Sequence, residues 1–114
     1  MMGEALPPVV ERMYDVTRWV IAKVGTFPRD QRFLLGQRIV NTCLDVLEGL
    51  IEAAFMPAGE EKVARLRALN SRLDVLRYLL RLAKDLRLMD QGAWEHVVGA
   101  LLRVGRMLGG WARA

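Results

Sequence analysis

The sequence predicts an all-α protein, built as an antiparallel up-down-up-down four-helix bundle. Hydrophobic residues make up 53% of the 114 residues; Leu, Ala, Arg and Met are abundant, whereas strand formers other than Val are sparse. Turn-forming residues at 25–28, 57–59 and 89–92 divide the chain into four segments with helical periodicity. Because the connections are short, consecutive helices should pack antiparallel. We expect one domain over residues 1–114, with helices at about 8–24, 29–56, 60–88 and 91–111.

The first two predicted helices have clear apolar faces. In segment 8–24 the recurring apolar residues are Val9, Met13, Val16, Val20 and Val24. Segment 29–56 has one seam of Gly36, Ile39, Cys43, Val46, Leu50 and Ala53 and a neighbouring seam of Phe33, Val40, Leu44, Leu47, Ile51 and Ala54. Its start is marked by Pro28, which suits a first helical turn, and by Asp30, whose charge complements the helix dipole.

The third predicted helix also has two apolar seams. One consists of Leu66, Leu69, Leu73, Leu76, Leu80 and Ala83, and the other of Val75, Leu79, Leu82 and Leu86. Together they are wider than the roughly 100° stripe that a helix in a small bundle needs. Either this helix is central and well buried, or the second seam is an interface between subunits. Because no helix of a four-helix bundle is wholly enclosed, we favour a homo-oligomer with Val75, Leu79, Leu82 and Leu86 in its interface.

The fourth predicted helix covers about 91–111. Gly109 and Gly110 are interpreted as a helix stop, and Trp111 as an aromatic that docks after it. The glycines follow no strand, so they do not form a dinucleotide-binding fingerprint.

The strongest functional feature of the sequence is a basic face on the third helix. Residues 58–89 contain eight basic and four acidic side chains, and hold most of the net charge of +4. Arg77, Arg81 and Lys84 recur at i, i+4 and i+7, and Arg87 extends the line toward the predicted helix end. Such a stripe fits a phosphate backbone. The alternative is an ordinary solvated face with ion pairs such as Arg81 with Asp85.

The sequence has no catalytic or metal-binding motif, so we expect no enzyme, metal or cofactor. The single histidine, His96, directly follows Glu95 and cannot form a Glu-x-x-His pair. A carboxylate row at Asp45, Glu48 and Glu52 is interpreted as a solvated or Arg-paired face. The lone Cys43 fits a reducing compartment, and no signal peptide or membrane span is recognised. We therefore expect a cytoplasmic protein.

Three stretches resemble a known family. They are residues 27–39 (FPRDQRFLLGQRI), 80–88 (LRLAKDLRL) and 105–111 (GRMLGGW). The chain resembles the accessory variability determinant (Avd) of diversity-generating retroelements, within the wider family of four-helix proteins associated with ribosomal RNA intervening sequences. The resemblance implies a non-enzymatic bundle that assembles as a homopentameric basic barrel. Its implied partners are the retroelement reverse transcriptase and template RNA, with cDNA as a further candidate.

The resemblance also suggests roles for single residues. Pro28 and Gly36 are expected to be structural, for helix initiation and close helix approach, and Trp111 to close the bundle end. The basic residues expected to bind RNA or the polymerase are Arg29, Arg32, Arg38, Arg81, Lys84, Arg87 and Arg106, with Arg77 added from the stripe. The alternative for some of these arginines is that they form ion pairs between subunits instead of binding RNA or the polymerase.

Two functions follow from these observations. The first is an accessory protein that scaffolds a reverse transcriptase on its RNA and supports mutagenic retrohoming, acting through avidity rather than bond chemistry. The alternative is a self-associating interaction bundle of the ribosomal intervening-sequence type, whose charges serve only solubility.

Overall fold

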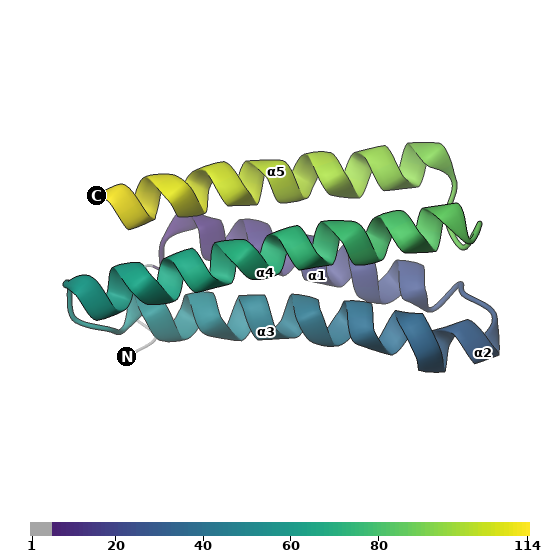
Figure 1. Ribbon diagram of the computed structural model, residues 1–114, viewed down its shortest axis with the longest axis horizontal. Helices are drawn as coiled ribbons and strands as arrows, with labels where there is room; N and C mark the ends of the chain where they lie inside the picture. The colour runs from purple at the N-terminus through teal and green to yellow at the C-terminus, as the bar shows by residue number, and fades with distance from the viewer. Residues whose placement is uncertain (1–5) are drawn as a thin grey trace.

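The computed structural model describes residues 6–114, which form four helical arms and contain no β-strand (Figure 1). The arms are α1 (Pro8–Val24), a continuous arm of α2 (Arg29–Gln31), η1 (Arg32–Gly36) and α3 (Gln37–Ala54), then α4 (Glu60–Asp85) and α5 (Gln91–Arg113). Neighbouring contacts join α1 with α3, α3 with α4, α4 with α5, and α5 with α1. The predicted all-α four-helix bundle is therefore confirmed, and α3 and α5 occupy diagonal corners of it.

The arm predicted as a helix over about 29–56 is helical from Arg29 to Ala54, but it contains a π turn at η1 that was not predicted from the sequence. The N–H of Gln37 donates to the carbonyl of Arg32, five residues earlier, instead of four. A π turn holds an extra residue and changes the direction of the side chains that precede it. Phe33, predicted to continue an apolar seam, is consequently 67% exposed, as is Leu34.

The ends of the second and third arms also differ from the predicted bounds. The second arm ends at Ala54 instead of 56. α4 ends at Asp85 instead of 88, because the N–H of Leu88 turns back to the carbonyl of Ala83 at 2.9 Å. This turn places Arg87 beyond the helix, with a positive φ of 62°.

The predicted helix stop at Gly109 and Gly110 is wrong, since α5 continues through both residues to Arg113. Leu108 is fully buried, and Trp111 and Ala112 pack against the core after the glycines. This packing outweighs the low helix propensity of glycine. At the other end of α5, the Asp90 carboxylate accepts a hydrogen bond from the Ala93 N–H at 2.8 Å and caps the helix.

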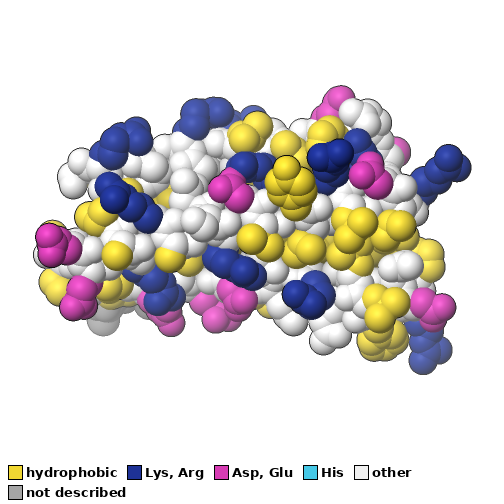
Figure 2. All heavy atoms as spheres, viewed as in Figure 1, with side chains coloured by type: hydrophobic (Ala, Val, Ile, Leu, Met, Phe, Trp, Pro, Cys, Tyr) yellow, Lys and Arg dark blue, Asp and Glu magenta, His cyan; other side chains and the backbone are white. Residues whose placement is uncertain are grey.

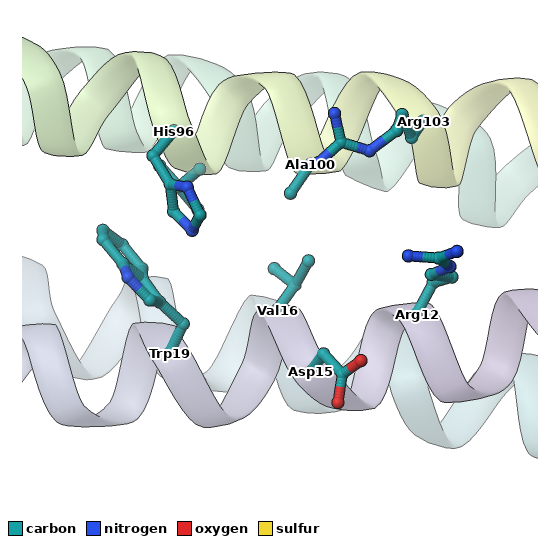
Figure 3. A pocket seen from close by; sticks show the side chains of 8 residues that line it. Arg12, Asp15, Val16, Trp19, His96, Ala100 and Arg103 are labelled. Carbon is teal, nitrogen blue, oxygen red and sulfur yellow. The ribbon is translucent and has the colours of Figure 1, made fainter.

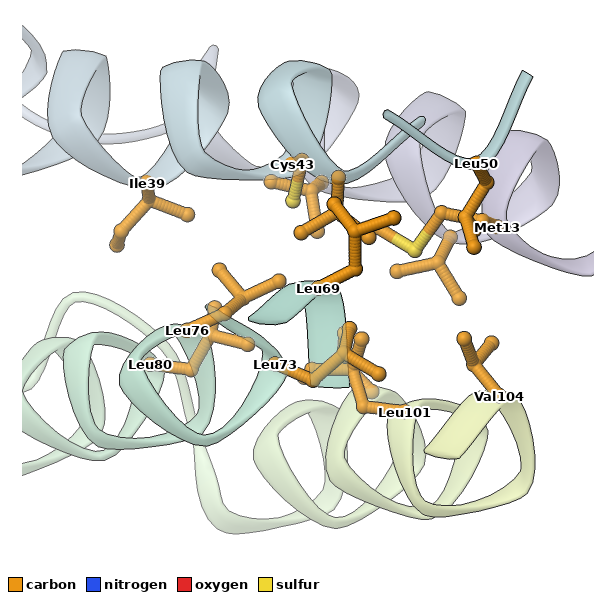
Figure 4. Packing of buried hydrophobic residues seen from close by; sticks show 14 of the residues in the cluster. Met13, Ile39, Cys43, Leu50, Leu69, Leu73, Leu76, Leu80, Leu101 and Val104 are labelled. Atoms are coloured by element: carbon orange, nitrogen blue, oxygen red, sulfur yellow. The ribbon is translucent and has the colours of Figure 1, made fainter. Parts of the chain in front are cut away.

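All four arms contribute side chains to one core (Figure 4). The inner seams predicted for the second and third arms are buried, and fully enclosed members include Ile39, Leu50 and Leu73. Cys43 lies in the same core, where burial raises the pKa of its thiol to about 12. In the part of the chain that the structure describes, no helix is both long and apolar enough to cross a membrane.

Candidate nucleic-acid interface

The predicted basic stripe lies on the flank of α4 that turns toward α5. The Lys84 Nζ is 4.1 Å from the centroid of the Trp94 ring, which α5 provides. Arg77 and Arg81 line a hollow of about 120 Å³ together with Tyr78, Trp94 and Val98. Residues one helical turn apart on α4 thus reach the same groove between two helices.

Each cation of the stripe has an acidic neighbour. Arg77 pairs with Asp74, the Arg81 Nε lies 3.7 Å from Asp85 Oδ2, and the Lys84 Nζ lies 3.7 Å from Asp85 Oδ1. Two carboxylates therefore accompany three cations, and a positive charge remains. Exposed ion pairs of this kind contribute at most about 1 kcal/mol, so a phosphate can compete for the guanidinium groups.

Tyr78 is the feature of this groove that sequence reasoning assigned no role. Its side chain is 70% exposed and lies between Arg77 and Arg81 along α4. An exposed ring between cations is typical of surfaces that stack unpaired bases. The sequence signal that could have identified Tyr78 is the alternation of basic and aromatic residues at 77, 78 and 81.

The remaining predicted binding residues are not gathered with the stripe. Arg29 and Arg32 are exposed at the start of the second arm, and Arg38 is exposed in the first turn of α3. Arg106 is exposed on α5, two residues from the buried Leu108 and on the opposite side of that helix. Arg87 does not extend the stripe, because α4 has already ended at Asp85.

The three residues expected to be structural lie at helix junctions. Pro28 precedes the first turn of α2 instead of lying in it, and its carbonyl accepts the N–H of Arg32 at 3.0 Å. Gly36 is buried, and a Cβ added to it would lie 2.6 Å from Val24 Cγ1. Trp111 is half-buried near the chain end, with Lys62 Nζ 5.3 Å from its ring centroid.

A second surface follows the opposite flank of α4. The Arg65 Nη2 reaches Glu52 Oε1 of α3 at 2.7 Å, so the flank that contains Arg65 faces α3. Leu79 lies about four helical turns further on nearly the same flank. The four predicted interface residues lie on this α3-facing flank of α4. Leu79 is half-buried, and the other three are exposed: Val75, Leu82 and Leu86. We call these four residues the α3–α4 apolar surface.

Further apolar side chains extend this surface around α3. Because α3 and α4 are antiparallel with Glu52 opposite Arg65, the π turn with Phe33 and Leu34 lies level with the end of α4. Figure 2 shows hydrophobic side chains gathered at this boundary of α3 and α4, toward the right of the view. On α1, Tyr14 and Ile21 are exposed on the flank away from Trp19, which faces α5. Apolar groups thus lie on both flanks of α3.

Among residues 6–114, no group of three His, Cys, Asp or Glu side chains is close enough to hold a metal ion. The described surface has a basic groove beside α5 and exposed apolar side chains on both flanks of α3.

Comparison with known proteins places the chain in a family. No curated protein matches it. A family model described as bAvd-like matches residues 9–114, which cover nearly all of α1 and every later helix. The match agrees with the observed four-helix bundle, and the family is one of accessory proteins that is not known as catalytic. The chain therefore belongs to the bAvd-like family, with an accessory role.

Proposed function

We propose that this chain is a non-catalytic accessory protein of a diversity-generating retroelement. It forms a homopentameric ring that binds the reverse transcriptase and the template RNA or its cDNA, and so supports mutagenic retrohoming in the cytoplasm. The family membership supports this proposal, and the observation that carries its nucleic-acid part is the groove with Arg77, Tyr78 and Arg81.

The apolar flanks of α3 support the ring. A closed ring requires a heterologous interface, in which two different patches of each subunit meet. The α3–α4 apolar surface is one such patch, and the exposed Tyr14 and Ile21 on the other side of α3 belong to a second. Exposed apolar groups on both flanks of one helix suit subunits that repeat around an axis.

Repetition explains how a modest basic groove binds RNA. One copy of the stripe holds three cations and two carboxylates, which is a weak field for a polyanion. Several copies held in a ring act together on one strand, and their combined affinity exceeds that of a single groove by orders of magnitude. The other basic residues predicted to bind RNA or the polymerase, Arg29, Arg32, Arg38, Arg87 and Arg106, are exposed and are the candidates for binding the polymerase.

The experiment that tests this function is binding of a labelled structured RNA across a salt series. The test variant is Arg77→Glu with Arg81→Glu, and the matched control is Arg67→Glu with Arg113→Glu, which changes the net charge equally at exposed sites outside the groove and away from the flanks of α3. Lys84 is left unchanged, because it packs over Trp94 and its loss would weaken the bundle by about 1 kcal/mol.

We expect the test variant to lose at least 100-fold in affinity and about two units of the salt slope for each groove that contacts the RNA, with little loss in the control. Equal losses in both variants would show attraction by net charge alone, and absence of binding at low salt would reject the nucleic-acid role.

A second candidate function is supported by the ion pairs. Since each cation of the stripe already has a carboxylate neighbour, the groove is also compatible with a solvated surface. The chain would then be a self-associating interaction bundle of the ribosomal intervening-sequence type, and the RNA experiment separates the two functions.

A further inference from the structure

A pocket of about 200 Å³ lies between α1 and α5, on the other flank of α5 from the basic groove (Figure 3). The residues that line it are Arg12, Asp15, Val16, Trp19, His96, Val97, Ala100 and Arg103. Neither the family match nor the proposed function assigns it a role.

Each wall of the pocket is built from one helix face. Arg12, Val16 and Trp19 recur at i, i+4 and i+7 on α1, and the same spacing places His96, Ala100 and Arg103 on α5. Because the two helices run antiparallel, the aromatic residues meet at one end and the arginines at the other, as Figure 3 shows. Seven residues of helix separate the two ends, about 10 Å.

The aromatic end is preorganised for a flat ring. The ring centroids of Trp19 and His96 lie 5.4 Å apart with an interplanar angle of 43°. The floor beside them is apolar, since Val16 and Val97 are buried members of the core. Indole and imidazole rings over an apolar floor favour stacking of a nucleobase, which contributes about 1–3 kcal/mol per base.

The other end of the pocket is cationic. Within residues 6–114, neither Arg12 nor Arg103 has a carboxylate oxygen within the 4.0 Å of an ion pair, although both side chains are exposed. Guanidinium groups present a planar set of donors that matches phosphate oxygens. Asp15 lies on the α1 wall between the two ends. Its carboxylate oxygens can accept hydrogen bonds from hydroxyl groups of a ligand, whereas they repel an anionic group.

We propose that this pocket binds one nucleotide, with its base against Trp19 and His96 and its phosphate between Arg12 and Arg103. The sugar hydroxyls then lie near Asp15. At about 200 Å³ the pocket is smaller than the roughly 300 Å³ of pockets that enclose whole drug-sized ligands, so it takes one base with its sugar and phosphate along the open side; a base that is paired and stacked in a duplex is not free to enter. This inference rests on the proposed nucleic-acid function, because the nucleotide belongs to a bound strand. It adds to that function that the bound nucleic acid is single-stranded at this site.

The only histidine of the chain makes the pocket easy to observe. The probes are the four nucleoside 5′-monophosphates, inorganic phosphate, a single-stranded RNA of 12 nucleotides and the duplex of the same sequence. The readout is the imidazole NMR signals of His96 in the full chain, together with the dissociation constant of each probe. The test variant is Arg12→Ala with Arg103→Ala, and Arg18→Ala on α1 is the control outside the pocket; thermal melting verifies that each variant folds.

We expect the single strand to shift the His96 signals, the duplex to leave them unchanged, and the test variant to bind the single strand at least tenfold more weakly than the control. A shift by a nucleoside monophosphate supports the same site and shows that a free nucleotide suffices; a shift by the strand alone shows that the site needs a strand. Phosphate alone acting as strongly as a nucleotide would overturn the role of the aromatic end.

Unchanged His96 signals, in a protein that binds RNA through Arg77 and Arg81, would overturn the pocket while the proposed function stands. Binding of monophosphates at His96 without any binding of RNA would reject the proposed function and retain a nucleotide pocket.

Discussion

The helices α3 and α5 lie at diagonal corners of one bundle, yet their outer surfaces differ. α3 contains one basic and three acidic side chains, whereas α5 contains three basic and one acidic. Exposed apolar groups lie beside α3, such as Phe33 of η1 and Leu82 of α4, while the basic groove and the arginine-lined pocket lie on the two flanks of α5. The same core thus supports two unlike surfaces.

This difference teaches how a small bundle can separate assembly from binding. Apolar groups around α3 suit contacts between copies, and basic and aromatic groups around α5 suit a polyanion. Since the two corners do not share a flank, subunits that meet through α3 leave α5 uncovered. The first three predictions below change one corner and use the other as the control.

The largest expected effect is loss of self-association in the double substitution Leu82→Glu with Leu86→Glu. The side chains are 46% and 50% exposed, so the isolated subunit should still fold. If each is a central interface residue worth about 2 kcal/mol, the dissociation constant rises by roughly a thousandfold. Mass measurement over a concentration series detects the change. Leu102→Glu on α5, where the side chain is 44% exposed, should leave assembly unaffected; equal dissociation there would remove the distinction between the corners.

Two glycines, Gly36 in the second arm and Gly110 in α5, allow the effect of side-chain packing on stability to be measured separately from the effect of helix propensity. An added Cβ at Gly36 meets Val24 Cγ1 at 2.6 Å, and the β-branched Val24 has little freedom to move, so Gly36→Ala should lower the free energy of unfolding by roughly 1–3 kcal/mol. At Gly110 on α5 nothing lies within 4 Å, so Gly110→Ala should raise it by roughly 0.5–1 kcal/mol. Denaturant titrations measure both changes, and a stabilised Gly36→Ala would contradict the close approach.

Two exposed tyrosines distinguish base stacking from general apolar contact. Tyr78→Ala, beside α5, should weaken binding of a single-stranded RNA too short to reach two subunits by about 1–3 kcal/mol, while Tyr14→Ala, beside α3, should not, because contact with a single groove does not depend on the ring of subunits. Because no charge is removed, the salt slope stays as in the unmodified chain. A reduced slope in Tyr78→Ala would mean that the substitution disturbs the arginines instead.

The buried side of α3 should respond to alkaline pH. Burial raises the pKa of the Cys43 thiol from its ordinary 9.0 to about 12, so its contribution to stability is fully present below pH 9.0 and is lost as the pH rises toward 12. Between pH 9 and 10, the difference in unfolding free energy between the unmodified chain and Cys43→Ala should narrow by about 1 kcal/mol, because the thiol of the unfolded chain is half ionised at pH 9 and almost fully ionised at pH 10. A constant difference would show that the thiol is not desolvated.

A small effect is also expected at the end of α4, beside the start of α5. Arg87 adopts a φ of 62°, which glycine adopts without steric cost, so Arg87→Gly should raise the free energy of unfolding by about 1 kcal/mol. The same substitution at Arg106, inside α5, should lower it by about 1 kcal/mol. Thermal melts compare the two, and the same sign in both would refute the left-handed turn at Arg87.

Much of the fold was predictable because helical periodicity is a local property. The four segments, the inner seams of the second and third arms and the exposed flank with Leu82 and Leu86 all follow from residue spacing. The basic stripe was found in the same way, although its nearness to Trp94 and Tyr78 depends on how α4 and α5 pack. The pocket with Arg12 and Arg103 was missed, because its two walls are far apart in the sequence.

By itself, the sequence determined the helix class, the apolar faces that pack inward and the uneven charge between helices. The tertiary structure alone decided the π turn at η1, the left-handed Arg87 and the continuation of α5 through Gly109 and Gly110. Packing energy explains this division. The spacing of side chains acts within one helix, whereas an extra residue in a turn, a strained φ or a glycine inside a helix is tolerated only where neighbouring helices compensate its cost.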